Sequence, residues 1–354
     1  MRGPVTGLAC SLSKLKMGKQ AGDAEASSEN FCVPFFALTS VAGEVARRAG
    51  FDQRCLEGET VKTIPAFVLA AAADKNLVRT RILAIQHMQR MRGRSQSQLM
   101  RCSDQNFYVV KFSNNPQHRR VLANEMFGAL LARIAGLPVP EPTVLEVTEE
   151  LIHRTPELNI HLVGGATPCE AGMQFGSPYV VNPLKGQVFD YLPATMLERV
   201  QNVATFAGML VLDKWTGNCD SRQAAFWRLI SQCNYAVAFI DQEQCFNGGN
   251  WNFPDTALGG VYSQNVVYEN ILGWDSFEPW LSRIEDMSQN SISGAAEKIP
   301  PDWYMEDSCA LGALVRKLAT RRTMIRSLLA AFRLSSRKPF PNWGEVDSKS
   351  SVVV

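Results

Sequence analysis

The sequence predicts an α+β fold with two lobes, a small strand-rich lobe followed by a mainly helical one. Three observations predict it. With 354 residues, the chain is long enough to bury the cores of two lobes. Short apolar segments with the alternation of strands are concentrated between residues 80 and 147. A Gly- and Pro-rich segment, residues 175–193, separates them from longer segments with helical periodicity.

The composition excludes several classes of protein. The chain has 36 Lys and Arg against 34 Asp and Glu, so no global charge favours direct binding of nucleic acid or of an anionic membrane. Nine cysteines without a CxxC pair, and only four histidines, argue against a disulfide framework and a zinc site. The longest apolar run, residues 64–73, is too short to cross a bilayer. We expect a cytoplasmic protein, since scattered cysteines fit a reducing compartment.

We expect four regions along the chain. Residues 1–79 form an N-terminal extension that is partly disordered and carries no evident chemistry. Residues 80–186 form the N-lobe and residues 187–334 the C-lobe. Residues 335–354 form a disordered tail.

The N-lobe begins with a strand, a loop and two further strands. Residues 80–88 alternate weakly like a strand, and residues 90–98, "RMRGRSQSQ", form a basic, serine-rich loop. Residues 99–102 pair with residues 106–112 across the turn "SDQN", because Asn and Asp favour turns. Lys111 then lies near the end of the third strand.

A helix follows these strands. Asn115 is its expected cap, Pro116 suits the first helical position, and Gly136 ends the helix. Glu125 lies beside its apolar stripe. Residues 143–147, "TVLEV", alternate as a further strand.

The C-lobe begins with a helix over residues 197–215, which runs directly into the polar segment "DKWTGNCDSRQAAF". A strand–turn–strand pattern continues from this segment and ends at Asp241. Helical segments are expected around residues 275–286 and 303–333.

The polar residues occur in the order in which kinase folds use them for phosphoryl transfer. Such folds need a small-residue loop over the phosphates, a strand lysine, a helix glutamate, a catalytic loop and a metal-binding aspartate after a hairpin. This order is more informative than any one motif. The candidates are the loop with Ser95 and Ser97, then Lys111, Glu125, Asp220 with Asn218, and Asp241.

Five segments together resemble the HipA-like kinase family. They are "FYVVKF", "NNPQHRRVLANEMFGALLARIAGLPVPEP", "VFDYLP", "LDKWTGNCDSRQAAF" and "AFIDQEQCF", and the likeness covers roughly residues 80 to 285. The resemblance implies a protein-kinase-like fold, ATP and Mg²⁺ as cofactors, and a hydroxyl acceptor on a protein or a small molecule. The family includes a serine kinase of a bacterial toxin–antitoxin pair, so an antitoxin-like regulator is a further expected partner.

The resemblance also implies roles for individual residues. Asp220 matches the catalytic aspartate, and Asp241 matches the metal-binding aspartate. The ATP-binding residues that the resemblance implies are Lys111 for the phosphates, Glu125 as its ion-pair partner, and Phe189 and Tyr191 at the adenine. Independently of the resemblance, Ser95 and Ser97 of the loop are expected to donate hydroxyl or backbone N–H hydrogen bonds to phosphate.

One position departs from the family pattern. Kinases place a metal-binding asparagine five residues after the catalytic aspartate, and Ala225 occupies that position here. Asn218 is one replacement, and Gln223 is another oxygen donor nearby. Alternatively the register shifts, so that Asp213 and Asn218 form the catalytic pair.

The sequence leaves three functions open. The first is a kinase that transfers the γ-phosphate of ATP to a hydroxyl, expected to be a Ser or Thr of a protein. The second, motivated by Ala225, is a pseudokinase or nucleotide-binding partner module without turnover. The third is a small-molecule or lipid kinase on the same scaffold.

Overall fold

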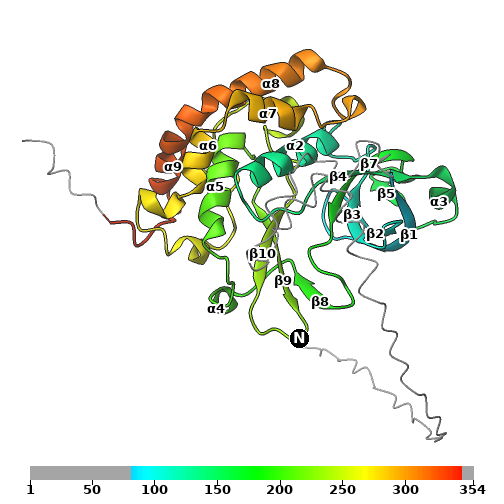
Figure 1. The fold of residues 1–354 in the computed structure, drawn as a ribbon, viewed down its shortest axis with the longest axis horizontal. Helices are drawn as coiled ribbons and strands as arrows, with labels where there is room; N and C mark the ends of the chain where they lie inside the picture. Colours follow the sequence, from blue (N-terminus) through cyan, green and yellow to red (C-terminus); the bar gives the residue numbers. More distant parts are fainter. Residues whose placement is uncertain (1–80, 345–354) are drawn as a thin grey trace, which may run out of the picture. The chain divides into compact units, whose positions relative to one another are not determined.

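Residues 81–344 are described by a computed structural model of the chain (Figure 1). The expected N-terminal extension, residues 1–79, lies outside the described residues, and so do residues 345–354. Within the part that is described, no helix is long and apolar enough to span a membrane.

Five strands form a closed barrel in the order β1-β2-β3-β7-β4 (Figure 1). Neighbouring strands are antiparallel except β1 and β4, which pair in parallel and close the barrel. The strands are β1 (Ile82–Arg90), β2 (Gln98–Cys102), β3 (Phe107–Lys111), β4 (Thr143–Val147) and β7 (Gly172–Pro178).

Strand β3 separates the barrel core from a second surface. Successive side chains of a strand point to opposite faces. Tyr108 and Val110 therefore belong to the core inside the barrel, whereas Val109 and Lys111 line a cavity on the other face. This alternation brings Lys111 out of the barrel core while it remains 6% exposed.

A second sheet contains the predicted hairpin. Its strands lie in the order β10-β9-β8 and are all antiparallel. They are β8 (Gly186–Phe189), β9 (Gln223–Leu229) and β10 (Ala236–Ile240). Two further strands, β5 (Asn159–Leu162) and β6 (Gly165–Pro168), form a separate hairpin. The Gly- and Pro-rich segment thus contains the end of β7 and the whole of β8 in addition to a connection.

The larger hydrophobic core is formed mainly by helices, including α2, and it also contains residues of the hairpin β9–β10. Trp215 is fully buried in it and its indole Nε1 donates to the backbone oxygen of Leu318, 2.9 Å away. The α-helices are α2 (Val121–Ile134), α3 (Glu149–His153), α4 (Ala194–Leu197), α5 (Thr205–Thr216), α6 (Trp280–Glu285), α7 (Gln289–Ala296), α8 (Ser308–Arg321) and α9 (Ile325–Arg333).

The structure differs from the sequence expectation at the start of α2. The helix begins at Val121, with Arg120 as its N-cap residue, and not directly after Asn115. The Asn115 side chain instead forms a local turn, because its Oδ1 accepts from the backbone N of Gln117 at 3.0 Å. Its Nδ2 donates to the backbone oxygen of Ser95 and ties this turn to the serine-rich loop.

The C-terminal part also differs from expectation. A disordered tail was expected from residue 335, but Phe340 and Trp343 are buried in the helical core. Their rings pack against each other at 5.4 Å and against Phe277 at 5.9 Å each. Residues 335–344 are therefore packed onto the helical core, because burying two large aromatic rings stabilises this segment.

Candidate functional site

A cavity of about 460 Å³ lies where barrel strands, helix α2 and the second sheet meet. A cavity of this volume fits a nucleotide-sized ligand. Its lining contains both polar and apolar side chains, and we call the part around Lys111 the polar end and the apolar part of the lining the apolar end. The polar side chains that line the cavity include Ser95, Ser97, Lys111, Glu125, Asp220, Gln223, Asp241 and Glu243.

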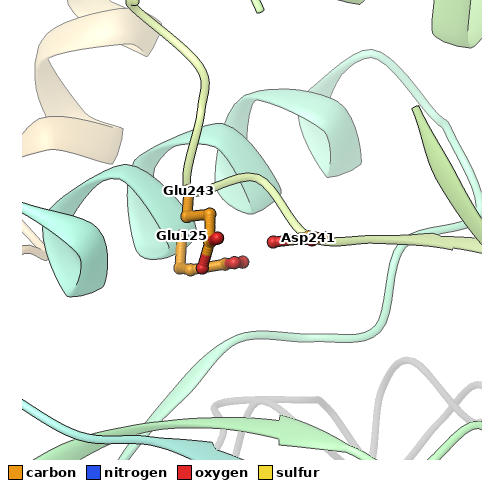
Figure 2. A group of neighbouring side chains, drawn as sticks. All are labelled: Glu125, Asp241 and Glu243. Carbon is orange, nitrogen blue, oxygen red and sulfur yellow. The ribbon is translucent and has the colours of Figure 1, made fainter. Parts of the chain in front are cut away.

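Lys111 lies among three carboxylates at the polar end. Figure 2 shows these carboxylates, which belong to Glu125, Asp241 and Glu243. The Lys111 Nζ contacts Glu125, which comes from helix α2, so the expected ion pair is present. The same Nζ lies 2.8 Å from Asp241 and 2.6 Å from Glu243, both in the segment that follows β10. Carboxylates from helix α2 and from the segment after β10 thus contact the same buried ammonium.

The carboxylates differ in burial. The side chains of Glu125 and Glu243 are each 4% exposed, whereas that of Asp241 is 17% exposed. Asp241 has a φ of 68°, which is uncommon for a residue other than glycine. This conformation occurs where the chain leaves β10, and Asp241 is the carboxylate of the three that remains most accessible from the cavity.

The ionisation of the group follows from this burial. Burial disfavours the charged ammonium, but Asp241, Glu125 and Glu243 outweigh it and raise the pKa of Lys111 well above its ordinary value. Burial raises the pKa of Glu125 to about 7 and also raises the pKa of Glu243, against the pull of Lys111. Burial would also raise the pKa of Asp241, but Lys111 holds it below its ordinary value. Asp241 is therefore the most firmly ionised acid of the group.

Glu243 is the functional candidate that the sequence reasoning missed. Its second carboxylate oxygen accepts from the Gln117 side chain, and its backbone oxygen accepts from Asn124 at 2.8 Å. The only signal in the sequence was that a second acidic residue follows Asp241 two positions later, because Asp241 has a left-handed backbone conformation just after β10 and strand alternation does not apply there. The pattern "DQE" therefore indicated that Glu243 could accompany Asp241.

Asp220 lies at the mouth of the cavity and its side chain is 40% exposed. Its Oδ2 lies 3.1 Å from Nη2 of Arg94, which belongs to the serine-rich loop. Its Oδ1 accepts from the backbone N of Ser221 at 2.7 Å. Asp220 thus presents a partly solvated carboxylate to the same cavity that contains Lys111.

Asn218 and Asp213 do not line this cavity. The Asn218 amide nitrogen donates to Asp213 Oδ1 at 3.0 Å, and its side-chain oxygen accepts from the backbone N of Asp220 at 3.1 Å. Asp213 is fully buried against Arg222, with Nε to Oδ2 at 2.9 Å. Both donor and acceptor of Asn218 are therefore occupied in shaping the loop that carries Asp220.

Arg222 links this loop to the segment with Asp241. Its Nη1 donates to the backbone oxygens of Ile240 and Asp241, at 2.8 and 3.0 Å. Burial opposes the charge of Arg222, but the Asp213 carboxylate raises its pKa above the ordinary value. The guanidinium therefore stays charged and holds the Asp241 backbone in place.

Gln96 anchors the serine-rich loop to the backbone of a neighbouring strand. Gln96 has a φ of 52°, and its side chain accepts from the backbone N of His161 and donates to the backbone oxygen of the same residue, both at 2.8 Å. The hairpin β5–β6 thus anchors the loop. Ser95 and Ser97 are 9% and 6% exposed and line the cavity.

The apolar end of the cavity is formed by other residues than those expected. Phe189 and Tyr191 are not among the lining residues, although their neighbours Val188 and Asp190 are. Phe189 packs against Tyr235, and Tyr191 is 59% exposed. The apolar lining comes from Val109, Ala129, Val139, Pro140, Phe175, Val180, Val188, Ala225, Phe239 and Ile240.

The donor set at the polar end fits a hard divalent cation. Asp241 offers an ionised carboxylate, and Gln223, an exposed residue at the start of β9, lines the cavity beside it. Gln223 pairs in register with Ile240, the residue before Asp241. Carboxylate and amide oxygens are ligands that Mg²⁺ accepts. Ala225 offers no such atom, because its side chain is a methyl group. It is 5% exposed and pairs with Ala238 across the hairpin.

Several solved structures are similar to this chain. A proinflammatory kinase of Helicobacter pylori, CtkA, has 16% identity and a TM-score of 0.46, with 72% of this chain and 99% of that chain covered. The Golgi casein kinase with Mn and ADP bound has 10% identity and a TM-score of 0.39, with 75% and 77% covered. HipA of Shewanella oneidensis, in complex with HipB and operator DNA, has 11% identity and a TM-score of 0.39, with 70% and 68% covered.

The family comparison is the stronger finding. Among curated proteins, none is similar enough to this chain to count as a match. The family described as HipA-like kinase matches residues 82–333, which include the barrel, the second sheet and helices α2 to α9. The match extends over more than half of the chain and confirms the family that the sequence motifs resemble. The chain belongs to the HipA-like kinase family.

Proposed function

We propose that this chain transfers the γ-phosphate of ATP to a hydroxyl, namely a serine or threonine of a protein. The observation that carries the proposal is the contact of Lys111 with both Glu125 and Asp241, inside a cavity that Asp220 also lines. Phosphoryl transfer by kinases needs this set of groups. The cytoplasmic location and an antitoxin-like regulator belong to the same proposal.

The proposal includes a two-lobed arrangement. The barrel and helix α2 act as the smaller lobe, and the second sheet with helices α4 to α9 acts as the larger one. The cavity supports this division, because it is lined by Val109 and Phe175 from the barrel and by Val188 and Phe239 from the second sheet. The adenine is held at this apolar end, and the phosphates extend toward Lys111.

Each polar residue has a role in this proposal. Lys111 neutralises the phosphates, and Glu125 with Glu243 fixes its ammonium. Asp241, assisted by Gln223, holds Mg²⁺, which neutralises phosphate oxygens and orients them when it is bound. Ser95 and Ser97 donate to the phosphates from the anchored loop. Asn218 supports the reaction by shaping the loop of Asp220.

The transfer forms one phosphorus–oxygen bond and breaks another. The acceptor oxygen forms a bond to the γ-phosphorus, while the bond from that phosphorus to the β–γ bridging oxygen breaks. The bond electrons leave with ADP. Asp220 accepts the proton of the acceptor hydroxyl as the new bond forms. The exposure of Asp220 at the cavity mouth supports this role, because an acceptor from outside can reach it.

One observation favours a second function. Ala225 and Ala238 pair where kinases have a metal-binding asparagine, so the ligand that kinases use there for a second metal is missing. A pseudokinase would bind ATP without forming ADP. Parallel reactions with a protein, a small molecule or a lipid as the acceptor would show which of these classes the chain phosphorylates.

The experiment is a measurement of ADP formation by the wild type and Asp220→Asn, with Asp275→Asn as control. Asp275 is exposed and does not line the cavity. We expect Asp220→Asn to lower the rate by about 10²- to 10⁴-fold, with ATP affinity retained. We expect Asp275→Asn to match the wild type. ATP binding without ADP formation by the wild type would favour the pseudokinase, and full activity of Asp220→Asn would refute the assigned role.

A further inference from the structure

The charges in the cavity are unevenly distributed. At the inner end, three carboxylates surround the single ammonium of Lys111. At the rim, the serine-rich loop contributes Arg90, Arg92 and Arg94 to the lining. Because Lys111 is already paired with these carboxylates, the outer phosphate of a metal-bound triphosphate, which remains anionic, finds little unpaired positive charge at the inner end. The compensating positive charge is available at the rim.

The missing metal ligand makes this compensation more important. A second metal would ordinarily neutralise the transferring phosphoryl group. Ala225 is a buried residue of β9 with a methyl side chain, and its cross-strand partner is also alanine. Neither partner in this pair offers an oxygen to a cation.

Arg94 is the rim arginine that contacts the candidate catalytic residue. Its Nη2 lies 3.1 Å from Asp220 Oδ2, although 126 residues separate the two along the chain. By contrast, Arg90 donates to Gln96 inside its own loop, and the structure records no contact of Arg92 with Asp220. Arg94 is thus the guanidinium at the point where the acceptor hydroxyl and the γ-phosphate must meet.

The contact between Arg94 and Asp220 leaves the guanidinium free to reorient. The side chain of Arg94 is 81% exposed. Exposed ion pairs contribute little stability, so the guanidinium exchanges partners at small cost. Gly93 precedes it with a φ of 123°, and no heavy atom lies within 4 Å of the position of a Cβ there. Planar guanidinium groups bind phosphate oxygens with two parallel hydrogen bonds.

We propose that Arg94 is a catalytic residue whose guanidinium moves from Asp220 to the oxygens of the transferring phosphoryl group and replaces the charge of a second metal. The inference rests on the proposed phosphotransferase function. It also frees the Asp220 carboxylate to accept the proton of the acceptor hydroxyl. The Arg94–Asp220 pair is therefore the resting arrangement of two groups that separate when the nucleotide binds.

The test compares binding of ADP with Mg²⁺ and binding of the same ligand with aluminium fluoride, which mimics the transferring phosphoryl group. Calorimetry is carried out on the full chain as wild type, Arg94→Ala and the control Arg154→Ala. Arg154 is an exposed arginine that pairs with Glu150 and does not line the cavity. We expect Arg94→Ala to retain ADP affinity within about twofold, and to lose at least about tenfold in affinity for the aluminium fluoride complex. We expect Arg154→Ala to match the wild type.

A second variant separates charge from a merely structural effect. Ala225→Asn supplies the missing ligand, so in the Arg94→Ala background it should restore much of the lost affinity and add a second bound Mn²⁺ per complex. An Arg94→Ala protein that binds the aluminium fluoride complex like the wild type overturns the inference. So does a wild type that binds two Mn²⁺ or gains nothing from aluminium fluoride. Absence of ADP binding by the wild type would instead overturn the proposed function.

Discussion

The guanidinium of Arg222 binds the buried carboxylate of Asp213 and, with its other nitrogen, the backbone oxygen of Asp241. One charged side chain thus connects the loop of Asp220 to the segment that carries the candidate metal ligand. Asp213, which a shifted register would make catalytic, is the buried counterion of this connection. Its burial gives it a role in stability that Asp220 at the cavity mouth does not have.

Removing one partner of this pair should destabilise the protein strongly. Asp213→Asn leaves a buried guanidinium without its counterion, and we expect a loss of about 3 kcal/mol in the free energy of unfolding. Urea denaturation followed by circular dichroism measures it. Glu285→Gln is the control, because it breaks an exposed pair with Arg326 and should cost less than about 1 kcal/mol. Equal effects of the two variants would contradict the structural role of Asp213.

Glu125 and Glu243 should substitute for each other as partners of Lys111. Each is buried and contacts the same ammonium, so either one can hold it when Asp241 binds a metal. We expect Glu125→Gln and Glu243→Gln each to lower ATP affinity less than about tenfold, and the double variant to lower it more than about 100-fold. Calorimetric titration of the wild type, the two single variants and the double variant with ATP gives the coupling energy between Glu125 and Glu243. Additive losses would mean that Glu243 has no part in positioning Lys111.

The anchor of the serine-rich loop should control nucleotide affinity. Gln96→Gly removes two hydrogen bonds to the hairpin and keeps a residue that accepts positive φ, so the loop becomes more mobile. We expect ATP affinity to fall about tenfold, since each hydrogen bond contributes about 1 kcal/mol. Gln105→Gly is a matched control, because Gln105 also has positive φ but lies in the turn between β2 and β3. A similar loss in both variants would refute the role of the anchor.

Lys214 should make stability depend on pH in the alkaline range. Burial lowers its pKa from the ordinary value of 10.5 to about 8, although Asp213 and Asp255 oppose this. As pH falls from 10.5 to 8, the unfolded chain binds this proton before the folded chain does, so the folded state loses stability. Below the folded-state pKa the loss is complete.

The measurement compares the wild type with Lys214→Met in urea at pH 7.5 and pH 10. The Lys214 ammonium donates to the backbone oxygens of Ala257 and Gly259, both at 2.7 Å, and methionine lacks the titrating group. We expect the free energy of unfolding of the wild type, relative to that of the variant, to increase by on the order of 2 kcal/mol from pH 7.5 to pH 10. If the difference in the free energy of unfolding between the wild type and Lys214→Met is the same at both pH values, the lowered pKa of Lys214 is contradicted.

The sequence predicted those parts of the site that follow from local pattern and order. Lys111 at the end of a strand and Glu125 on the next helix were predicted from the alternation of β3 and the apolar stripe of α2, and their ion pair is present. The hairpin that ends at Asp241 was predicted in the same way. In each case a short-range hydrophobic pattern determines the element, and its last polar residue is then positioned by the element.

Other features depend on contacts between distant segments, which local patterns do not contain. The pair of Arg94 with Asp220 joins two loops, and the burial of Phe340 and Trp343 depends on α9 and on Phe277. Asn218 was expected to bind metal because of its residue type. Its hydrogen bonds to Asp213 and Asp220 become visible only when the loop is folded.

Calorimetry of ATP binding with and without Mg²⁺, on the wild type and Asp241→Asn, tests most directly whether this cavity binds a metal-nucleotide complex. We predict that Mg²⁺ strengthens ATP binding by the wild type, and that Asp241→Asn loses most of this enhancement while it remains folded. The loss should be at least about tenfold, because the carboxylate is the ionised ligand of the site. ATP binding that ignores both Mg²⁺ and the substitution would contradict the metal-nucleotide site, and no ATP binding by the wild type would contradict the kinase proposal as a whole.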